Sequence, residues 1–162
     1  MCFDTDSAPP IPVIAGAAVS HEDLELEAAD GNRFAAFLAT PEEHSATGVV
    51  ILPDVRGLYR FYEELALRFA ERGYAALAFD YFGRSAGIAK RDDEFDYPPH
   101  VDAVTPEQIQ LDTRAAVERL RAHGCASMKS SVRCQASADA AWNSSCLRSK
   151  KLCGAPSNSI SS

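Results

Sequence analysis

The chain has 162 residues, of which 46% are hydrophobic and 24% are charged, and its formal net charge is −7. This length and composition are typical of one globular domain with its own core. The acidic balance argues against a nucleic-acid partner, because phosphate binding needs a basic face. No apolar run approaches membrane-spanning length, so we expect no membrane partner either.

The first 20 residues are apolar and contain several prolines, but they lack the basic start of a secretory signal. Asp4 and Asp6 stand there instead. We therefore interpret residues 1–20 as a flexible lead to a cytoplasmic protein. One folded α/β domain is expected over residues 21–124.

An alternation of apolar and polar side chains predicts a half-buried strand over residues 23–29 and a return strand over residues 34–39. Between them, Ala-Asp-Gly-Asn is typical of a hairpin turn in which Gly31 takes a positive φ. An antiparallel hairpin that precedes parallel strands predicts a mixed sheet.

Residues 48–87 have the pattern strand, helix, strand. Short apolar runs predict buried strands over residues 49–52 and 74–79, and a helix that begins at Leu58 or Tyr59 lies between them. Such a βαβ unit builds a parallel sheet. Asp54 and Asp80 follow the two strands, and ligands of open α/β sheets bind at the carboxyl ends of strands. A site is therefore expected at this edge.

Residues 80–104 are predicted to be a long loop, which is usually functional or mobile in a compact domain. After it, Thr105, Pro106 and Gln108 have the spacing of a helix start with a capping box. The apolar spacing continues this helix until Gly124, a natural terminator.

The composition changes after Gly124. Residues 1–124 hold 22 acidic and 11 basic side chains, whereas residues 125–162 hold one acidic and five basic side chains, four cysteines and eleven serines. We find no helix or strand signal there and expect disorder. The cysteines lack metal-binding spacing and a nearby histidine, so no zinc is expected. This abrupt change of composition leads us to interpret the tail as out of frame, and a shifted reading of possible codons for residues 135–139 permits Gly-Phe-Cys-Gly.

The strand ending in Pro-Asp-x-x-Gly, the strand Gly-Tyr-x-x-x-x-x-Asp and the arginine shortly after it resemble the N-terminal half of the dienelactone hydrolase family, a branch of the α/β-hydrolases. The resemblance covers about residues 24–124. It implies an incomplete α/β-hydrolase-type fold, with a mixed, mainly parallel sheet and flanking helices. It also implies hydrolysis of a small-molecule ester or lactone by a Cys or Ser nucleophile with His and Asp, without a metal or cofactor.

Three residues match functional positions of that family. Asp54 matches an acid that contacts the nucleophile, and Val55 matches the residue whose backbone N–H contributes to the oxyanion hole. Arg84 matches the arginine that binds the substrate carboxylate. The family's nucleophile elbow and the rest of its triad lie beyond the resemblance, so no nucleophile is assigned. Cys134 lacks the flanking glycines of an elbow, and His100 stands far earlier than the family's histidine.

Two functions stay open: a dienelactone hydrolase-type enzyme, or a catalytically inactive truncated fragment. A flavodoxin-like or Rossmann domain would need a glycine-rich phosphate turn, which residues 53–57 do not provide. Without an elbow strand, the strand over residues 49–52 would keep an unpaired edge, so we expect a marginally stable or molten chain. The sequence predicts no oligomeric state.

Overall fold

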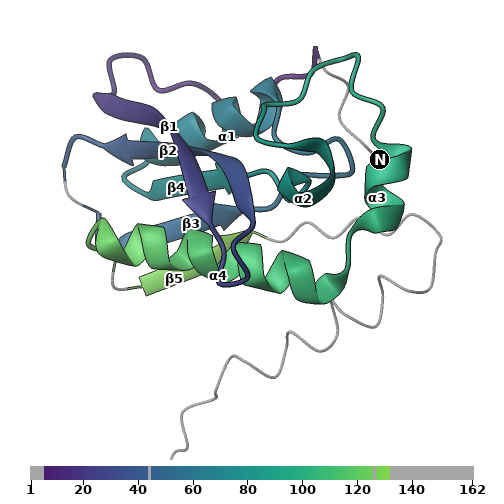
Figure 1. Cartoon of the computed structure of the whole chain (residues 1–162). Coiled ribbons are helices and arrows are strands. Elements are labelled where there is room, and N and C mark those ends of the chain that lie inside the picture. Colours follow the sequence, from purple (N-terminus) through teal and green to yellow (C-terminus); the bar gives the residue numbers. More distant parts are fainter. Residues whose placement is uncertain (1–5, 44, 126, 132–162) are drawn as a thin grey trace, which may run out of the picture.

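The computed structural model describes residues 6–43, 45–125 and 127–131 (Figure 1). They form one sheet with helices on both faces. The sheet has the order β1-β2-β4-β3-β5. Its strands are β1 (Val19–Glu27), β2 (Arg33–Pro41), β3 (Thr47–Ile51), β4 (Ala75–Phe79) and β5 (Ser127–Ser131). β1 and β2 form the predicted hairpin, β2 pairs antiparallel with β4, and β3 is parallel to both β4 and β5. The predicted mixed sheet is confirmed.

Two long helices bury opposite faces of the sheet, because successive strand side chains point to opposite sides. α1 (Arg60–Ala70) packs on one face, and α4 (Pro106–Ala122) packs on the other, in front of the sheet in Figure 1. The core on the α1 side includes Phe37, Val49 and Ile51, whereas the core on the α4 side includes neighbours in the same strands such as Leu38 and Val50. Both helices begin near the predicted positions.

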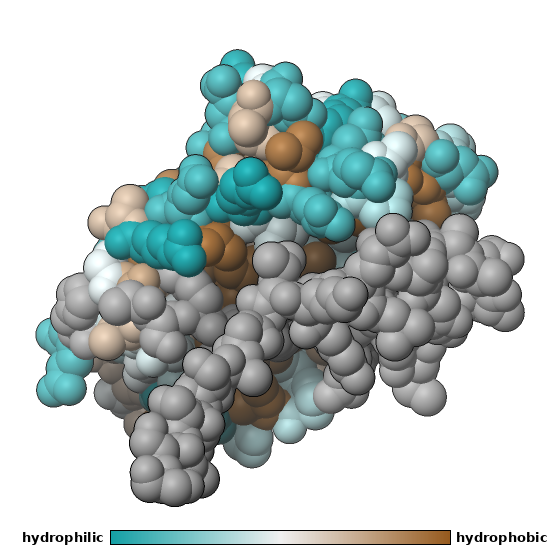
Figure 2. Space-filling view, turned by 90° about the horizontal axis from the view of Figure 1, so that it is seen from below, coloured by the Kyte–Doolittle hydropathy of each residue, from teal (hydrophilic) through white to brown (hydrophobic). Residues whose placement is uncertain are grey.

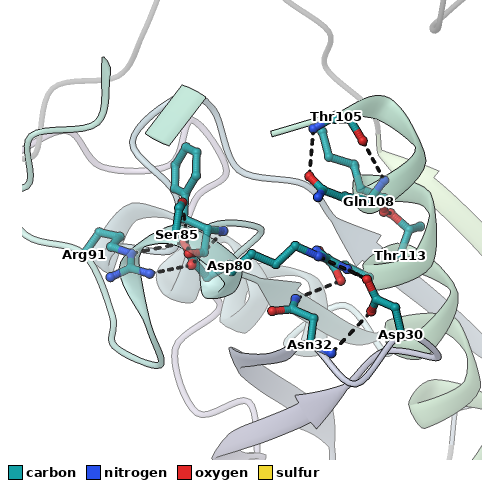
Figure 3. A network of polar contacts seen from close by, with 12 residues as sticks. Asp30, Asn32, Asp80, Ser85, Arg91, Thr105, Gln108 and Thr113 are labelled. Atoms are coloured by element: carbon teal, nitrogen blue, oxygen red, sulfur yellow. Dashed lines mark hydrogen bonds and ion pairs between the residues drawn. The ribbon is translucent and has the colours of Figure 1, made fainter. Parts of the chain in front are cut away.

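The start of α4 has the predicted capping box. Thr105 Oγ1 accepts a hydrogen bond from the Gln108 N–H at 3.4 Å, and Gln108 Oε1 accepts one from the Thr105 N–H at 3.0 Å (Figure 3). Pro106 takes the first helical position, where no intrahelical N–H bond is lost. The helix ends at Ala122, and Gly124 follows it with φ of 97°.

β5 corrects the expectation that the chain has no element after Gly124. Ser127–Ser131 pairs parallel with β3, with Gly48 opposite Met128 and Ile51 opposite Ser131. β3 therefore has neighbours on both sides, and the unpaired β3 edge expected from the sequence is wrong. A strand forms without an apolar run because pairing with a neighbouring strand outweighs intrinsic β-propensity. The rest of the expected disordered, out-of-frame tail, residues 132–162, lies outside the described residues.

The expected loop over residues 80–104 contains two short helices, α2 (Gly83–Ala86) and α3 (Pro98–Ala103). The close approach of α2 to β2 requires glycine at position 83, since a Cβ there would lie 2.4 Å from the Arg33 carbonyl oxygen. Such short helices escape a periodicity analysis, which needs longer windows.

Two hydrogen bonds join the N-terminal lead to the residues that directly follow α1. The Ile14 N–H donates to Glu71 Oε2 at 3.0 Å, and Arg72 Nη2 donates to the Pro12 carbonyl at 2.8 Å. β1 then begins at Val19, two residues before the expected domain boundary. Residues 1–5 of the lead lie outside the described residues.

Seen from below, the coloured surface is mainly hydrophilic at its rim, and hydrophobic side chains show mostly in recesses between hydrophilic ones (Figure 2). Three large hydrophobic side chains among the described residues are exposed, namely Val13, Ile14 and Ile88. Within the described ranges, every helix is too short or too polar to span a membrane.

Candidate active site

The carboxyl ends of β3, β4 and β5 meet at one edge of the sheet, because the three strands are parallel. The loop after β3 carries Asp54 and Val55, and the segment after β4 carries Asp80 and Arg84. Residue 51 lies opposite residue 131 in the register of β3 with β5. The carboxyl end of β5 therefore lies beside the carboxyl end of β3, where the chain leads into the Asp54 loop.

Both backbone groups of Asp54, its N–H and its carbonyl oxygen, are hydrogen-bonded. Its N–H donates to Tyr62 Oη at 2.8 Å, and its carbonyl oxygen accepts from the Gly57 N–H at 3.0 Å and from the Tyr81 hydroxyl. Its Oδ1 accepts from the Arg56 N–H at 3.0 Å. Within the described part of the chain, Oδ2 of Asp54 is buried and has no hydrogen-bond partner. A buried carboxylate oxygen without a partner is costly, so it marks a place where a donor can bind.

The Tyr62 hydroxyl beside Asp54 stays protonated over the ordinary pH range. Burial is the main cause that raises the pKa of Tyr62, and the negative charge of Asp54 raises it further. The side chain of Tyr62 is also part of a cluster of aromatic rings with Tyr59 and Phe61, with ring centroids 5.1 and 5.2 Å from that of Tyr62. Tyr62 is therefore a fixed neutral group at this edge.

Asp80, the second carboxylate at a strand end, is an internal anchor. It is fully buried, and its oxygens accept from the Leu58 N–H at 3.1 Å and from the Phe82 N–H at 3.0 Å. Arg91 Nη2 donates to Asp80 Oδ2 at 2.8 Å (Figure 3), and the Arg91 N–H donates to the Leu58 carbonyl at 2.7 Å. These bonds tie the loop after β3 to the segment after β4, so Asp80 fixes the shape of the edge.

The Arg84 guanidinium, which was expected to bind a substrate carboxylate, is already bound by two carboxylates of the chain. Its Nη1 donates to Asp112 Oδ2 at 2.6 Å, and its Nη2 and Nε donate to Asp30 Oδ2 at 2.7 and 3.2 Å. Asn32 Nδ2 completes the group with a bond of 3.1 Å to Asp112 Oδ1. Arg84 therefore joins α2 to the β1–β2 turn and to α4. The structure does not bring this guanidinium together with Asp54.

A shallow hollow lies beside the Asp54 loop. It is lined by Arg56 and by four residues between α2 and α3, namely Asp92, Asp93, Phe95 and Tyr97. Phe95 also stacks on His100, with ring centroids 5.1 Å apart, and faces the Arg91 guanidinium at 4.7 Å. His100 is thus an aromatic packing partner in the described structure, and no catalytic role was expected for it.

Residues 83–87 read Gly-Arg-Ser-Ala-Gly, which fits the Gly-x-Ser-x-Gly pattern of a nucleophile elbow. The structure does not give this segment the elbow's geometry. Ser85 lies inside α2, its Oγ faces the Phe82 carbonyl at 3.5 Å, and every described residue with a positive φ is a glycine. An elbow instead presents its nucleophile on a strained strand-to-helix turn. Ser85 is therefore no elbow nucleophile.

The described cysteine is not activated. Cys125 is buried, its thiol donates to the Ser45 carbonyl at 3.4 Å, and burial raises its pKa. A reactive cysteine has a lowered pKa instead. Cys134 lies outside the described residues. Across residues 6–43, 45–125 and 127–131, no group of three His, Cys, Asp or Glu side chains could hold a metal ion.

Sequence reasoning proposed Asp54 and Val55 as site residues but did not predict the residues that hold them. Tyr62, Tyr81 and Arg91 carry no local motif, because their contacts reach across to other segments of the fold. The one usable signal is position: Tyr62 lies on the first turn of α1 and Tyr81 directly follows the second strand-end carboxylate. Both places lie next to the edge where the site was expected.

Comparisons with known proteins identify the family of this chain. A model of the dienelactone hydrolase family matches residues 34–132. Carboxymethylenebutenolidase from Rhodococcus opacus is 30% identical over 119 residues, which cover 73% of this chain and 41% of that protein. A solved structure named m3DLH is 26% identical with a TM-score of 0.57, over 70% of this chain and 48% of that one.

A dienelactone hydrolase-like promiscuous phosphotriesterase from metagenomic libraries has the same fold. It is 24% identical with a TM-score of 0.58, over 71% of this chain and 48% of its own. The chain thus spans about two fifths of the curated relative and about half of these solved structures. Because the family match covers more than half of its residues, this chain belongs to the dienelactone hydrolase family.

Proposed function

We propose that the Asp54 loop forms one wall of a pocket that hydrolyses ester or lactone bonds of small molecules. In this proposal, the Val55 N–H stabilises the oxyanion of the tetrahedral intermediate, and Asp54 contacts the nucleophile. The observation that carries the proposal is the buried, unpartnered Oδ2 of Asp54 at the edge where β5 ends. In the family, the nucleophile elbow follows a strand of this kind.

The reaction requires a nucleophile that the described residues do not contain. The family uses a Cys or Ser with a His and an Asp, and none of the three is assigned in this chain. The alternative function, a catalytically inactive fragment, is supported by one specific observation: the single Gly-x-Ser-x-Gly segment of the described chain lies in a helix. We therefore propose that the 162-residue chain alone does not turn over esters by covalent catalysis.

In this proposal, Arg84 binds a carboxylate of the substrate, which must first replace one of the two carboxylates that Arg84 holds. A substrate carboxylate would replace Asp30, the more exposed of its two partners, because Asp112 is fully buried. A planar guanidinium can hold two carboxylates at once, which suits such an exchange. The substrate in this reading is an anionic ester or lactone.

An assay of the purified chain separates the two functions. The substrates are p-nitrophenyl acetate and an unsaturated five-membered lactone, each tested with and without iodoacetamide. We expect no hydrolysis that iodoacetamide reduces. Ser85→Ala is the matched control, and it should leave the background rate unchanged. Turnover that iodoacetamide abolishes would rule out the inactive fragment, and Cys134→Ser would then show whether that thiol is the nucleophile.

The hydrolase role itself is tested through the gene. If the DNA for residues 127–140 encodes a Gly-x-Cys elbow in a shifted frame, the protein read in that frame should hydrolyse the lactone in a thiol-dependent way. Asp54→Asn should then lower its kcat about 100-fold, in the range typical of a lost acid or base. If no frame encodes an elbow, the out-of-frame interpretation of the tail is wrong. If the substitution has no effect on kcat, Asp54 has no catalytic role.

A further inference from the structure

Two buried tyrosines hold the backbone of Asp54, one at its N–H and the other at its carbonyl oxygen. Tyr62 comes from the first turn of α1, and Tyr81 comes from the segment directly after β4. Each is 5% exposed or less, and each directs its hydroxyl to a backbone atom of Asp54. Neither contact belongs to a helix or a sheet, so the two hydroxyls serve this loop in particular.

Peptide planarity gives these two contacts a consequence for Val55. The Asp54 carbonyl and the Val55 N–H belong to one planar trans peptide group and point in opposite directions. Tyr81 and the Gly57 N–H both donate to that carbonyl oxygen, so they fix the plane of the group. Fixing the carbonyl fixes the direction of the N–H as well.

Tyr62 acts on the peptide group on the other side of Asp54. It accepts from the Asp54 N–H at 2.8 Å and so fixes the plane between Pro53 and Asp54. With both neighbouring planes fixed, the φ and ψ angles of Asp54 have little freedom. The direction of its Cα–Cβ bond is then fixed too, and the Arg56 N–H holds the carboxylate at Oδ1.

We propose that Tyr62 and Tyr81 are positioning residues that hold the Val55 N–H and the Asp54 carboxylate in the geometry needed for hydrolysis. This inference rests on the proposed function, because it takes the Val55 N–H as an oxyanion-hole donor. A donor of this kind stabilises the transition state only if it is already oriented before the charge develops. The two hydroxyls supply that orientation.

Backbone dynamics of the full 162-residue chain test the inference without any substrate. Tyr81→Phe keeps the ring, whose centroid lies 4.5 Å from that of Phe82, and removes only the hydroxyl. We expect the NMR order parameter of the Val55 N–H to fall from about 0.85, the rigid range, to below about 0.6, the flexible range. Order parameters in β3 and β4 should not change.

Tyr62→Phe is the second variant. It removes the acceptor of the Asp54 N–H, so hydrogen exchange of that amide should become at least about tenfold faster. Tyr74→Phe is the matched control, because Tyr74 lies just before β4, at the opposite end of the sheet. It should leave both readouts unchanged.

Each outcome decides the inference. A change confined to residues 54 and 55 supports it. Unchanged amides in both variants would overturn it, and so would an equal loosening of all of β3 and β4, which would mean that the tyrosines only stabilise the fold. If Tyr81→Phe does not fold, the exchange rate in Tyr62→Phe still decides. A failed ester assay leaves these readouts untouched, so the two proposals fail separately.

Discussion

At the scale of single residues, the Asp54 loop depends on one glycine. Gly57 has φ of 76°, and a Cβ at this position would lie 2.3 Å from Asp80 Oδ1 and 3.0 Å from Arg91 Cγ. The loop after β3 can therefore approach the buried Asp80–Arg91 pair only where no side chain intervenes. This close approach is what brings the backbone of residues 54–58 into position at the edge of the sheet.

Gly57→Ala should thus destabilise the protein strongly. We expect the free energy of unfolding to fall by about 2–5 kcal/mol, from left-handed strain and from the clash together. Gly31→Ala is the matched control: it has φ of 80° but no atom within 4 Å, so it should cost only about 1–2 kcal/mol. Urea unfolding followed by circular dichroism measures both. Equal losses in the two variants would contradict the packing argument.

Asp112 and Asp30 both form an ion pair with Arg84, but their contributions to the free energy of unfolding should change over different pH ranges. Burial is the largest cause that raises the pKa of Asp112 above 3.8, so its contribution to stability falls as pH rises from about 3.8 to its folded-state pKa. The hydrogen bond from Arg84 is the largest cause that lowers the pKa of Asp30. The contribution of Asp30 is therefore present above about 3.8 and is lost as pH falls through its folded-state pKa.

Unfolding free energies between pH 2.5 and about 6 should show this contrast. Relative to the wild-type protein, Asp112→Asn should become more stable as pH rises above about 3.8. Asp30→Asn should become less stable relative to wild type as pH rises from about 2.5 toward 3.8, because the wild type regains a contribution that the variant lacks. Parallel profiles for the two variants would contradict opposite pKa shifts of the two carboxyl groups.

At the scale of elements, those with local signals could be predicted from the sequence. The hairpin, the βαβ unit and the start of α4 at Thr105 each depend on neighbours within a few positions, and all three are confirmed. Asp54 could be placed because strand ends follow from the same patterns. β5 could not, because Ser127–Ser131 becomes a strand only through pairing with β3. The partners of Arg84 and Arg91 also lie on distant segments.

The capping box of α4 gives a prediction for an element. Thr105→Ala removes the acceptor of the Gln108 N–H and should lower the free energy of unfolding by about 1 kcal/mol. Thr113→Ala is its control in the same helix, where the Thr113 hydroxyl donates to the Ile109 carbonyl at 2.7 Å. That change should cost less, because alanine is the better residue for a helix interior. Similar losses would mean that the cap adds little.

At the scale of the whole molecule, β5 decides how the sheet ends. β3 carries the Asp54 loop, and its pairing with β4 and β5 places it inside the sheet. Without β5, its backbone N–H and C=O groups would form a free edge next to apolar residues such as Val49 and Ile51. Such edges pair with other chains and lead to aggregation. The marginal stability expected from the sequence should therefore apply to a chain that lacks β5.

Two truncations test this role of β5. A chain of residues 1–131 keeps the five strands of the described sheet, so we expect it to remain monodisperse and to melt in one cooperative transition. A chain of residues 1–124 loses β5, and we expect it to aggregate at micromolar concentration or to melt without a sharp transition. Size-exclusion chromatography with light scattering and thermal melts by circular dichroism distinguish them. If the shorter chain stayed monodisperse with an equally sharp melt, pairing with β5 would not be what protects β3, and the Asp54 loop would owe its position to β4, Asp80 and Arg91 alone.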